Sequence, residues 1–235
     1  MEPPMSPRLP TVFLPALLCD EMLYQDVIAA LGDAIEPQIL MSPQARLSDS
    51  VADILARAPR TFALVGTSYG ANLALAIAVA APERVSALWL MGCNAGVPAA
   101  GGPDLAAGLE ATPEAIIDFL AGIVVRPADH AATAAFKAMA HRVGAAAGAA
   151  QARALASRDD IWARLGELRM PALILSGDED PIAPPACGQQ LAQAMPHARF
   201  ELLSQCGHLP ALEQPKQAAA SFHAFIGEAA MQRAR

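Results

Sequence analysis

Three side chains of the kinds used in nucleophilic catalysis stand at separate points of the chain: Ser68, Asp180 and His208. A serine hydroxyl is a weak nucleophile until a neighbouring base removes its proton. A histidine can perform that step near neutral pH, and a carboxylate behind the imidazole fixes its tautomer and stabilises its charged form. Brought together, these three residue types would support acyl transfer through a covalent serine intermediate.

The serine lies in a Gly-x-Ser-x-Gly pattern formed by Gly66, Ser68 and Gly70. An apolar run at residues 62–65 precedes it, and a helix rich in Ala and Leu follows. A strand that turns directly into a helix strains its central residue and exposes that side chain at the strand end. The backbones pass too closely there for larger flanking residues, and the helix N-terminus favours developing negative charge. An ordinary glycine-rich turn is the alternative interpretation.

Asp180 and His208 also follow predicted strands, at residues 170–176 and 199–203. In an open parallel sheet, sites form beyond the carboxyl ends of the strands, so these side chains are expected at one edge. Asp178 is the alternative acid, although a turn residue is its more ordinary role. We favour Asp180 because of its spacing from Gly177 and the proline that follows it.

Other residues are weaker candidates for the site. Asn94 follows the predicted strand at residues 85–91 but cannot carry the charge of an acid. Cys206 stands two residues before His208, where a buried structural thiol is its commoner role. Four histidines have no partner residues at a matching spacing: His130, His141, His197 and His223. Three arginines could bind an acidic substrate group, although such residues are more often solvated: Arg142, Arg153 and Arg158.

Alternation of short apolar strands with helices predicts an α/β fold, with a mostly parallel sheet of about six strands and helices on both faces. The expected strands are residues 11–14, 37–41, 62–65, 85–91, 170–176 and 199–203. Between residues 96 and 165 the chain instead shows Ala-rich helical segments, a stretch too long for one ordinary crossover. We therefore expect a core at residues 1–95 and 166–235 and a small helical cap insertion at residues 96–165.

Composition narrows the classes of function. The 235 residues are 54% hydrophobic and carry a net charge of -7, with no Lys/Arg-rich run. This argues against nucleic acid and anionic membranes as partners. No apolar run reaches the ~20 residues needed to span a bilayer. The four cysteines have no metal-site spacing and are expected to be free thiols in a reducing compartment, which favours a cytoplasmic location.

The N-terminal region superficially resembles a lipoprotein signal, with Arg8, an apolar run and then Cys19. Pro10 and Pro15 interrupt that run, and bulky leucines stand where small residues precede a cleavage site. Cleavage there would also remove the first predicted strand. Secretion is therefore not expected.

Over nearly its whole length the chain resembles the α/β-hydrolase superfamily. Residues 66–70 resemble the nucleophile elbow, and residues 173–181 resemble the turn that carries the acid. Residues 207–215 are similar to the histidine loop of the esterase and carbon–carbon hydrolase branch. The order Ser, Asp, His is that of the superfamily. The resemblance implies a triad in which Ser68 is the nucleophile, His208 the base and Asp180 the acid.

Two departures from the superfamily affect the prediction. The superfamily often has His-Gly after its first central strand, whereas this chain has Pro15 and Ala16. By the resemblance, the backbone N–H groups of Leu17 and Tyr69 would form the oxyanion hole. The N-terminal strand pair of the superfamily has no counterpart here, which is why about six strands are expected.

The leading hypothesis is a cofactor-free and metal-free serine hydrolase that cleaves a carboxylic ester, or a thioester or amide, through an acyl-enzyme on Ser68. One alternative is a carbon–carbon bond hydrolase that uses the same triad. A second is a ligand-binding sensor on a hydrolase scaffold, since a fold does not fix function. The expected partner is a small, apolar acyl substrate. Candidate pocket residues in the insertion are Phe119, Ile123 and Trp162, for which simple packing is the default role.

Overall fold

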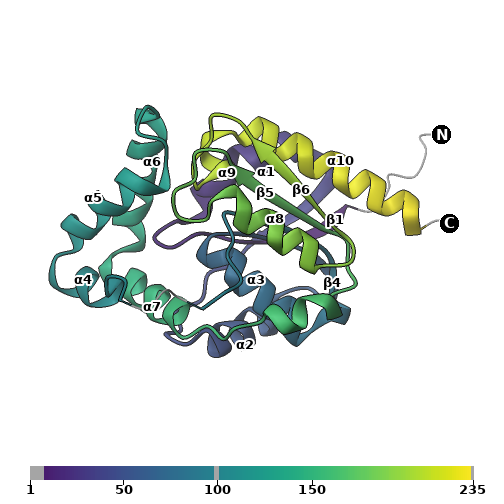
Figure 1. The fold of residues 1–235 in the computed structure, drawn as a ribbon, viewed down its shortest axis with the longest axis horizontal. Coiled ribbons are helices and arrows are strands. Elements are labelled where there is room, and N and C mark those ends of the chain that lie inside the picture. Colours follow the sequence, from purple (N-terminus) through teal and green to yellow (C-terminus); the bar gives the residue numbers. More distant parts are fainter. Residues whose placement is uncertain (1–7, 98–100, 234–235) are drawn as a thin grey trace.

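A six-stranded parallel sheet forms the centre of the computed structural model, which describes residues 8–97 and 101–233 (Figure 1). Residues 1–7 of the predicted core and 98–100 of the predicted insertion lie outside the described part. The sheet has the order β2-β1-β3-β4-β5-β6, and every neighbouring pair is parallel. The strands are β1 (Leu9–Leu14), β2 (Ile35–Ile39), β3 (Phe62–Thr67), β4 (Val85–Met91), β5 (Ala172–Gly177) and β6 (Ala198–Leu203).

The burial of each strand follows from its place in the sheet. Strands β3 and β5 are buried at every position because helices cover both faces of the sheet. Strand β2 lies at the edge of the sheet and pairs only with β1. Pro37 has no backbone N–H to donate, and at an edge this leaves no second neighbouring strand without a hydrogen bond. The prediction for this strand began two residues too late, because the proline was read as its start.

Helices pack on the two faces in the arrangement that right-handed crossovers require. Helix α1 (Gln25–Leu31) packs against the C-terminal helix α10 (Pro215–Arg233) on one face (Figure 1). The crossover helices α2 (Leu47–Arg57), α3 (Tyr69–Ala80) and α8 (Pro185–Ala194) lie on the other. Among the described helices, none combines the length and the apolar character that crossing a bilayer requires.

Four helices separate β4 from β5 and gather at the end of the molecule opposite both chain termini (Figure 1). Helix α4 begins after the cap residue Asp104, whose carboxylate accepts the Ala107 N–H at 3.0 Å. The chain returns to the sheet through the 3₁₀ helix η4 (Trp162–Glu167). The four helices are α4 (Leu105–Ala111), α5 (Pro113–Val124), α6 (His130–Val143) and α7 (Ala145–Ala156).

Two aromatic contacts tie the sheet to its surroundings. Trp89 of β4 stacks on Phe222 of α10 with ring centroids 4.5 Å apart, and both side chains are fully buried. Tyr24, at the end of the 3₁₀ helix η1 (Glu21–Tyr24), packs on Phe13 of β1. Its hydroxyl also donates to the Leu14 carbonyl at 2.9 Å and lies 2.8 Å from the Thr67 hydroxyl. Tyr24 therefore joins the carboxyl ends of β1 and β3.

We predict that Tyr24→Phe lowers the free energy of unfolding by about 1–3 kcal/mol, because the buried Leu14 carbonyl and Thr67 hydroxyl both lose a partner. Urea denaturation measures the change. Thr67→Val and the double variant complete a cycle, in which the two substitutions should be strongly non-additive. Wild-type stability in Tyr24→Phe would show that this link contributes nothing.

Candidate functional site

The turn between β3 and α3 has the strained geometry expected of a nucleophile elbow. Ser68 adopts φ 55° and ψ -114°, a conformation that a residue with a side chain rarely takes. A Cβ on Gly66 would overlap the Gly70 carbonyl, and one on Gly70 would overlap the Leu14 carbonyl. Both glycines are therefore required by close backbone contact, and the strain presents the Ser68 hydroxyl at the end of the strand.

The three predicted catalytic side chains lie in one hydrogen-bonded row. His208 Nε2 is 2.8 Å from Ser68 Oγ, and His208 Nδ1 is 2.8 Å from Asp180 Oδ2. The His208 and Asp180 side chains are almost fully buried, with relative exposures of 2% and 0%. The tautomer with hydrogen on Nδ1 donates to the carboxylate and leaves Nε2 able to accept the serine proton.

The two aspartates of the acid turn have different partners. The second oxygen of Asp180 accepts the N–H groups of Ile182 and Ala183, at 2.8 and 2.9 Å, which fixes the orientation of its carboxylate. Asp178 is exposed and accepts the Cys206 N–H at 3.1 Å. It therefore braces the loop before His208 and does not contact the imidazole.

Glu213 restrains the histidine loop through hydrogen bonds to its backbone. Its half-buried carboxylate accepts the N–H groups on both sides of His208, from Gly207 at 3.1 Å and Leu209 at 3.3 Å. It also accepts the Arg126 N–H at 3.0 Å. Burial raises the pKa of Glu213, and these hydrogen bonds oppose that shift. These contacts restrict the backbone that carries the imidazole.

Two further contacts limit where His208 can lie. Gly92 follows β4 with φ 57°, and a Cβ there would lie 3.0 Å from the imidazole and 2.7 Å from the His208 carbonyl. Arg126, which follows α5, pairs with Glu179 at 3.0 Å and donates to the Gln205 carbonyl at 3.0 Å. The insertion therefore contacts both the acid turn and the histidine loop.

The predicted oxyanion donors lie on the two segments nearest the serine. Tyr69 is the first residue of α3, where N–H groups have no acceptor within the helix. Leu17 lies in a turn closed by the Cys19 N–H and the Ala16 carbonyl at 3.0 Å. The next residue, Leu18, has φ 60°, and its N–H donates to Gln151 Oε1 of α7 at 2.9 Å. The roles of Tyr69 and Leu17 stay predictions.

A cavity of about 480 Å³ lies beside α3, where Asn72 both lines it and donates to the Ser68 carbonyl at 3.1 Å. Its walls combine apolar and charged side chains, among them Val51, Ala76, Val79, Ile161, Arg46 and Arg158. The predicted pocket residues Phe119, Ile123 and Trp162 do not line it. Phe119 is 49% exposed on α5, whereas Ile123 and Trp162 are partly buried against the core.

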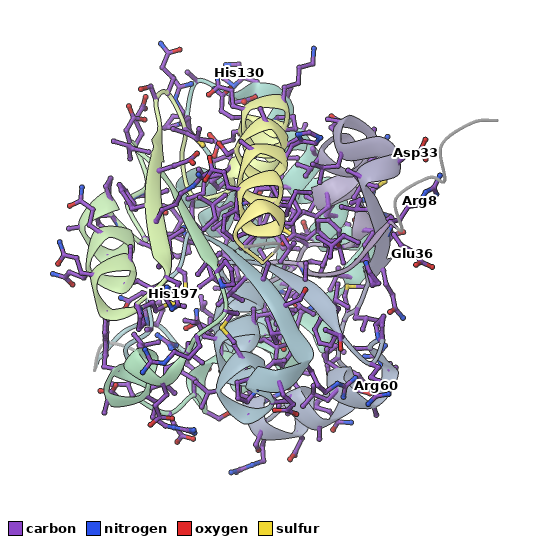
Figure 2. The ribbon with its side chains drawn as sticks, turned by 90° about the vertical axis from the view of Figure 1, so that its right-hand side faces the viewer. Arg8, Asp33, Glu36, Arg60, His130 and His197 are labelled. Carbon is purple, nitrogen blue, oxygen red and sulfur yellow. The ribbon has the colours of Figure 1, made fainter. Side chains whose placement is uncertain are left out.

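The structure also shows where several of the weaker candidates lie and what they contact. Arg142 and Arg153 form ion pairs with Asp20 and Glu110, whereas Arg158 donates to the Gly96 carbonyl beside the cavity. Cys206 is fully buried, and burial raises the pKa of its thiol, which opposes a nucleophilic role. His130 and His197 are exposed and lie well apart on the molecule (Figure 2).

Several residues contact the site loops in roles that were not predicted, among them Arg126, Arg142, Gln151 and Glu213; Arg142 had been weighed only as a group that binds an acidic substrate. Glu213 belongs to the quoted histidine block, so its spacing from His208 was a usable signal. Gln151 was a weaker signal, as a polar side chain within the Ala-rich segment at residues 145–156. The two arginines showed no pattern that distinguishes them from solvated residues.

Comparisons with known proteins identify the family of this chain. A family profile described as alpha/beta hydrolase fold matches residues 43–215. The chain is 31% identical over 176 residues to the 2-hydroxymuconate semialdehyde hydrolase of Pseudomonas putida, covering 71% of this chain and 62% of that protein. It is also 35% identical over 66 residues to the pimeloyl-[acyl-carrier protein] methyl ester esterase of Nitrosomonas europaea, covering 28% of this chain and 26% of that protein. These matches span less than two thirds of either relative.

Solved structures show the same fold at low sequence identity. The enol-lactonase from Burkholderia xenovorans superposes with a TM-score of 0.83 at 19% identity, covering 96% of this chain and 94% of that one. A thermophilic esterase from Thermogutta terrifontis gives a TM-score of 0.80 at 20% identity, covering 94% and 90%. The strand order, the elbow and the family match lead to one conclusion: this chain belongs to the α/β-hydrolase fold family.

Proposed function

We propose that this protein is a serine hydrolase that cleaves a carboxylic ester, or a thioester or amide, through an acyl-enzyme on Ser68. The observation that carries the proposal is the hydrogen-bonded row Ser68–His208–Asp180, in which the histidine and the acid are buried and each contact is 2.8 Å. This row sits at a strand–turn–helix elbow, where a nucleophile is accessible and a helix N-terminus favours negative charge. The esterase among its relatives is consistent with this chemistry.

The steps follow from the positions of these atoms. His208 Nε2 takes the Ser68 proton while Oγ attacks the acyl carbon, and the carbonyl electron pair moves to oxygen. The N–H groups of Tyr69 and Leu17 are proposed to stabilise that oxyanion. As the tetrahedral intermediate collapses, His208 gives its proton to the departing alcohol. Water, activated by the same imidazole, then releases the acid and restores Ser68.

Carbon–carbon bond hydrolysis is the second candidate, favoured by the names of several relatives. Besides the Pseudomonas putida hydrolase, a 2-hydroxy-6-oxononadienedioate/2-hydroxy-6-oxononatrienedioate hydrolase of Cupriavidus pinatubonensis is 29% identical over 174 residues. A serine–histidine–aspartate row serves both reactions, so the site geometry fits either. The two differ in the leaving group, which is an alcohol in one case and a carbanion in the other.

For the substrate we propose a small molecule with an apolar acyl group. The apolar, Ala-rich composition of residues 96–165 supports this. The cavity beside α3 is lined by neither Ser68 nor His208 and does not bear on the choice. We also propose that residues 96–165 act as a cap over the strand ends, supported by the position of α4–α7 (Figure 1). The buried thiols of Cys19, Cys93 and Cys206 favour a reducing, cytoplasmic setting.

A panel of p-nitrophenyl esters of graded acyl length, together with a vinylogous 1,5-diketone, distinguishes the two reactions. An esterase should turn over the esters with a maximum at one chain length and leave the diketone nearly untouched. A carbon–carbon hydrolase should show the opposite ranking. Ser68→Ala should abolish either activity. Ligand binding without Ser68-dependent turnover of any acyl substrate would instead support the sensor hypothesis.

We predict that a fluorophosphonate probe adds one label to the protein and that peptide mapping places it on Ser68, because the hydroxyl of this serine contacts the buried imidazole. Ser68→Ala should not be labelled. His208→Ala should be labelled far more slowly, since the hydroxyl loses its base. Full labelling of Ser68→Ala would place the nucleophile elsewhere.

We predict that Asp180→Asn lowers kcat by about 10⁴-fold, the loss seen for the equivalent change in a serine protease, because an amide favours the wrong histidine tautomer. Asp178→Asn is the matched control. Its amide oxygen can still accept the Cys206 N–H, so kcat should stay within about tenfold of the wild-type value. Steady-state kinetics on folded variants measure both. The reverse ranking would assign the acid to Asp178.

A further inference from the structure

The loop after β1, residues 15–20, is held by side chains that come from the insertion more than a hundred residues later. We call it the oxyanion loop, because it carries the predicted donor Leu17. Gln151 of α7 accepts the Leu18 N–H at 2.9 Å. Arg142 of α6 forms two hydrogen bonds to Asp20, at 2.6 and 3.1 Å. The conformation of this loop therefore depends on contacts outside the sheet.

The turn at the centre of the oxyanion loop is strained. The Cys19 N–H bonds to the Ala16 carbonyl, which makes Leu17 and Leu18 its central residues. Leu18 has φ 60°, whereas Leu17 is not among the residues with positive φ. This combination is that of a type II turn, which favours glycine at its second central position. A leucine there would reach negative φ if the peptide between Leu17 and Leu18 rotated to the type I arrangement.

Gln151 opposes that rotation. In the observed turn the Leu18 N–H points to Gln151 Oε1, and rotation would bring the Leu17 carbonyl toward the same oxygen. Unless the Gln151 amide also turned over to present its NH2 group, two acceptors would then face each other in a buried place, since Gln151 is 4% exposed and Leu18 fully buried. The contact leaves little room to adjust, because a Cβ on Gly148 of the same helix would overlap the Leu18 side chain.

Asp20 fixes the far end of the loop. Its side chain is 7% exposed and accepts the Met22 N–H at 3.0 Å, which caps η1. The Arg142 guanidinium donates two further hydrogen bonds to the same carboxylate. With the loop anchored at Asp20, the Gln151 contact holds the turn itself, next to Leu17.

We propose that Gln151 is a positioning residue for the oxyanion hole, an inference that rests on the proposed serine-hydrolase function. The Leu17 N–H belongs to the preceding Ala16–Leu17 peptide, so Gln151 acts on it by tethering the neighbouring residue, Leu18, to α7 and thereby holding Leu17 in place. An oxyanion donor is effective only when it is already oriented before charge develops. Gln151 therefore acts on the transition state through the backbone, without touching the substrate.

The test compares Gln151→Met, which keeps the length of the side chain but has no strong acceptor, with Gln151→Glu, which keeps an oxygen at the same reach. Gln151→Met should lower kcat about 10-fold to 100-fold with little change in KM, less than the loss of a whole donor. It should weaken inhibition by a trifluoromethyl ketone, whose serine adduct carries an oxyanion, by a similar factor. Gln151→Glu should keep the Leu18 amide protected from exchange, because its oxygen can still accept that N–H, although its charge would oppose the oxyanion.

A second readout does not require activity. Hydrogen exchange of the Leu18 amide, followed by NMR, should be slow in the wild-type protein and at least about 10-fold faster in Gln151→Met, because the amide loses its acceptor. Lys137→Met is the matched control, since it removes the ion pair with Asp118 within the insertion and leaves the oxyanion loop untouched. It should change neither the exchange of Leu18 nor kcat.

Three results would overturn the proposal: wild-type kcat and inhibition in folded Gln151→Met, unchanged exchange of the Leu18 amide in that variant, or an equal loss of kcat in Lys137→Met. The first denies the catalytic consequence, the second denies the hydrogen bond, and the third assigns the effect to general loosening of the insertion. Absence of Ser68-dependent turnover in the wild-type protein would instead contradict the proposed function, and the exchange result would still decide whether Gln151 holds the turn.

Discussion

The contact between the start of α3 and the end of β1 is the constraint on which the site depends. Gly70 lies so close to the Leu14 carbonyl that no Cβ fits between them, and Tyr24 joins Leu14 to Thr67 on the adjoining strand. These contacts place Ser68 beside the oxyanion loop. In the strand order β2-β1-β3, this is the point at which the direction of the chain across the sheet reverses, where ligands commonly bind. A wider separation would leave the serine without donors from that loop.

The histidine loop reaches the same point from the far side of the sheet and is positioned by hydrogen bonds to carboxylates. Glu213 accepts the N–H groups before and after His208, Asp178 accepts the Cys206 N–H, and Gly92 lies directly against the imidazole. Because buried N–H groups need acceptors, these bonds restrict the loop to few conformations. These contacts thereby set the orientation of the His208 imidazole, the proposed base.

The insertion contacts each loop of the site. Arg126 pairs with the acid turn and the histidine loop, and Gln151 and Arg142 hold the oxyanion loop. Each of these contacts fixes a backbone segment next to a proposed catalytic group. Because one fold can support many reactions, local contacts of this kind can distinguish the activities of its members. In our proposals, the insertion both covers the strand ends and orients the groups beneath it.

Local patterns in the sequence determined the sheet, the elbow and the identity of the three polar residues. Strand burial, the glycines around Ser68 and the spacing of Asp180 depend on neighbours within a few positions, so a linear pattern records them. Tertiary structure alone decided that Gln151 pairs with Leu18, 133 residues away, and that Glu213 also pairs with Arg126, 87 residues away. It also decided that Leu18 takes a positive φ, because a leucine adopts that conformation only when distant contacts offset its strain.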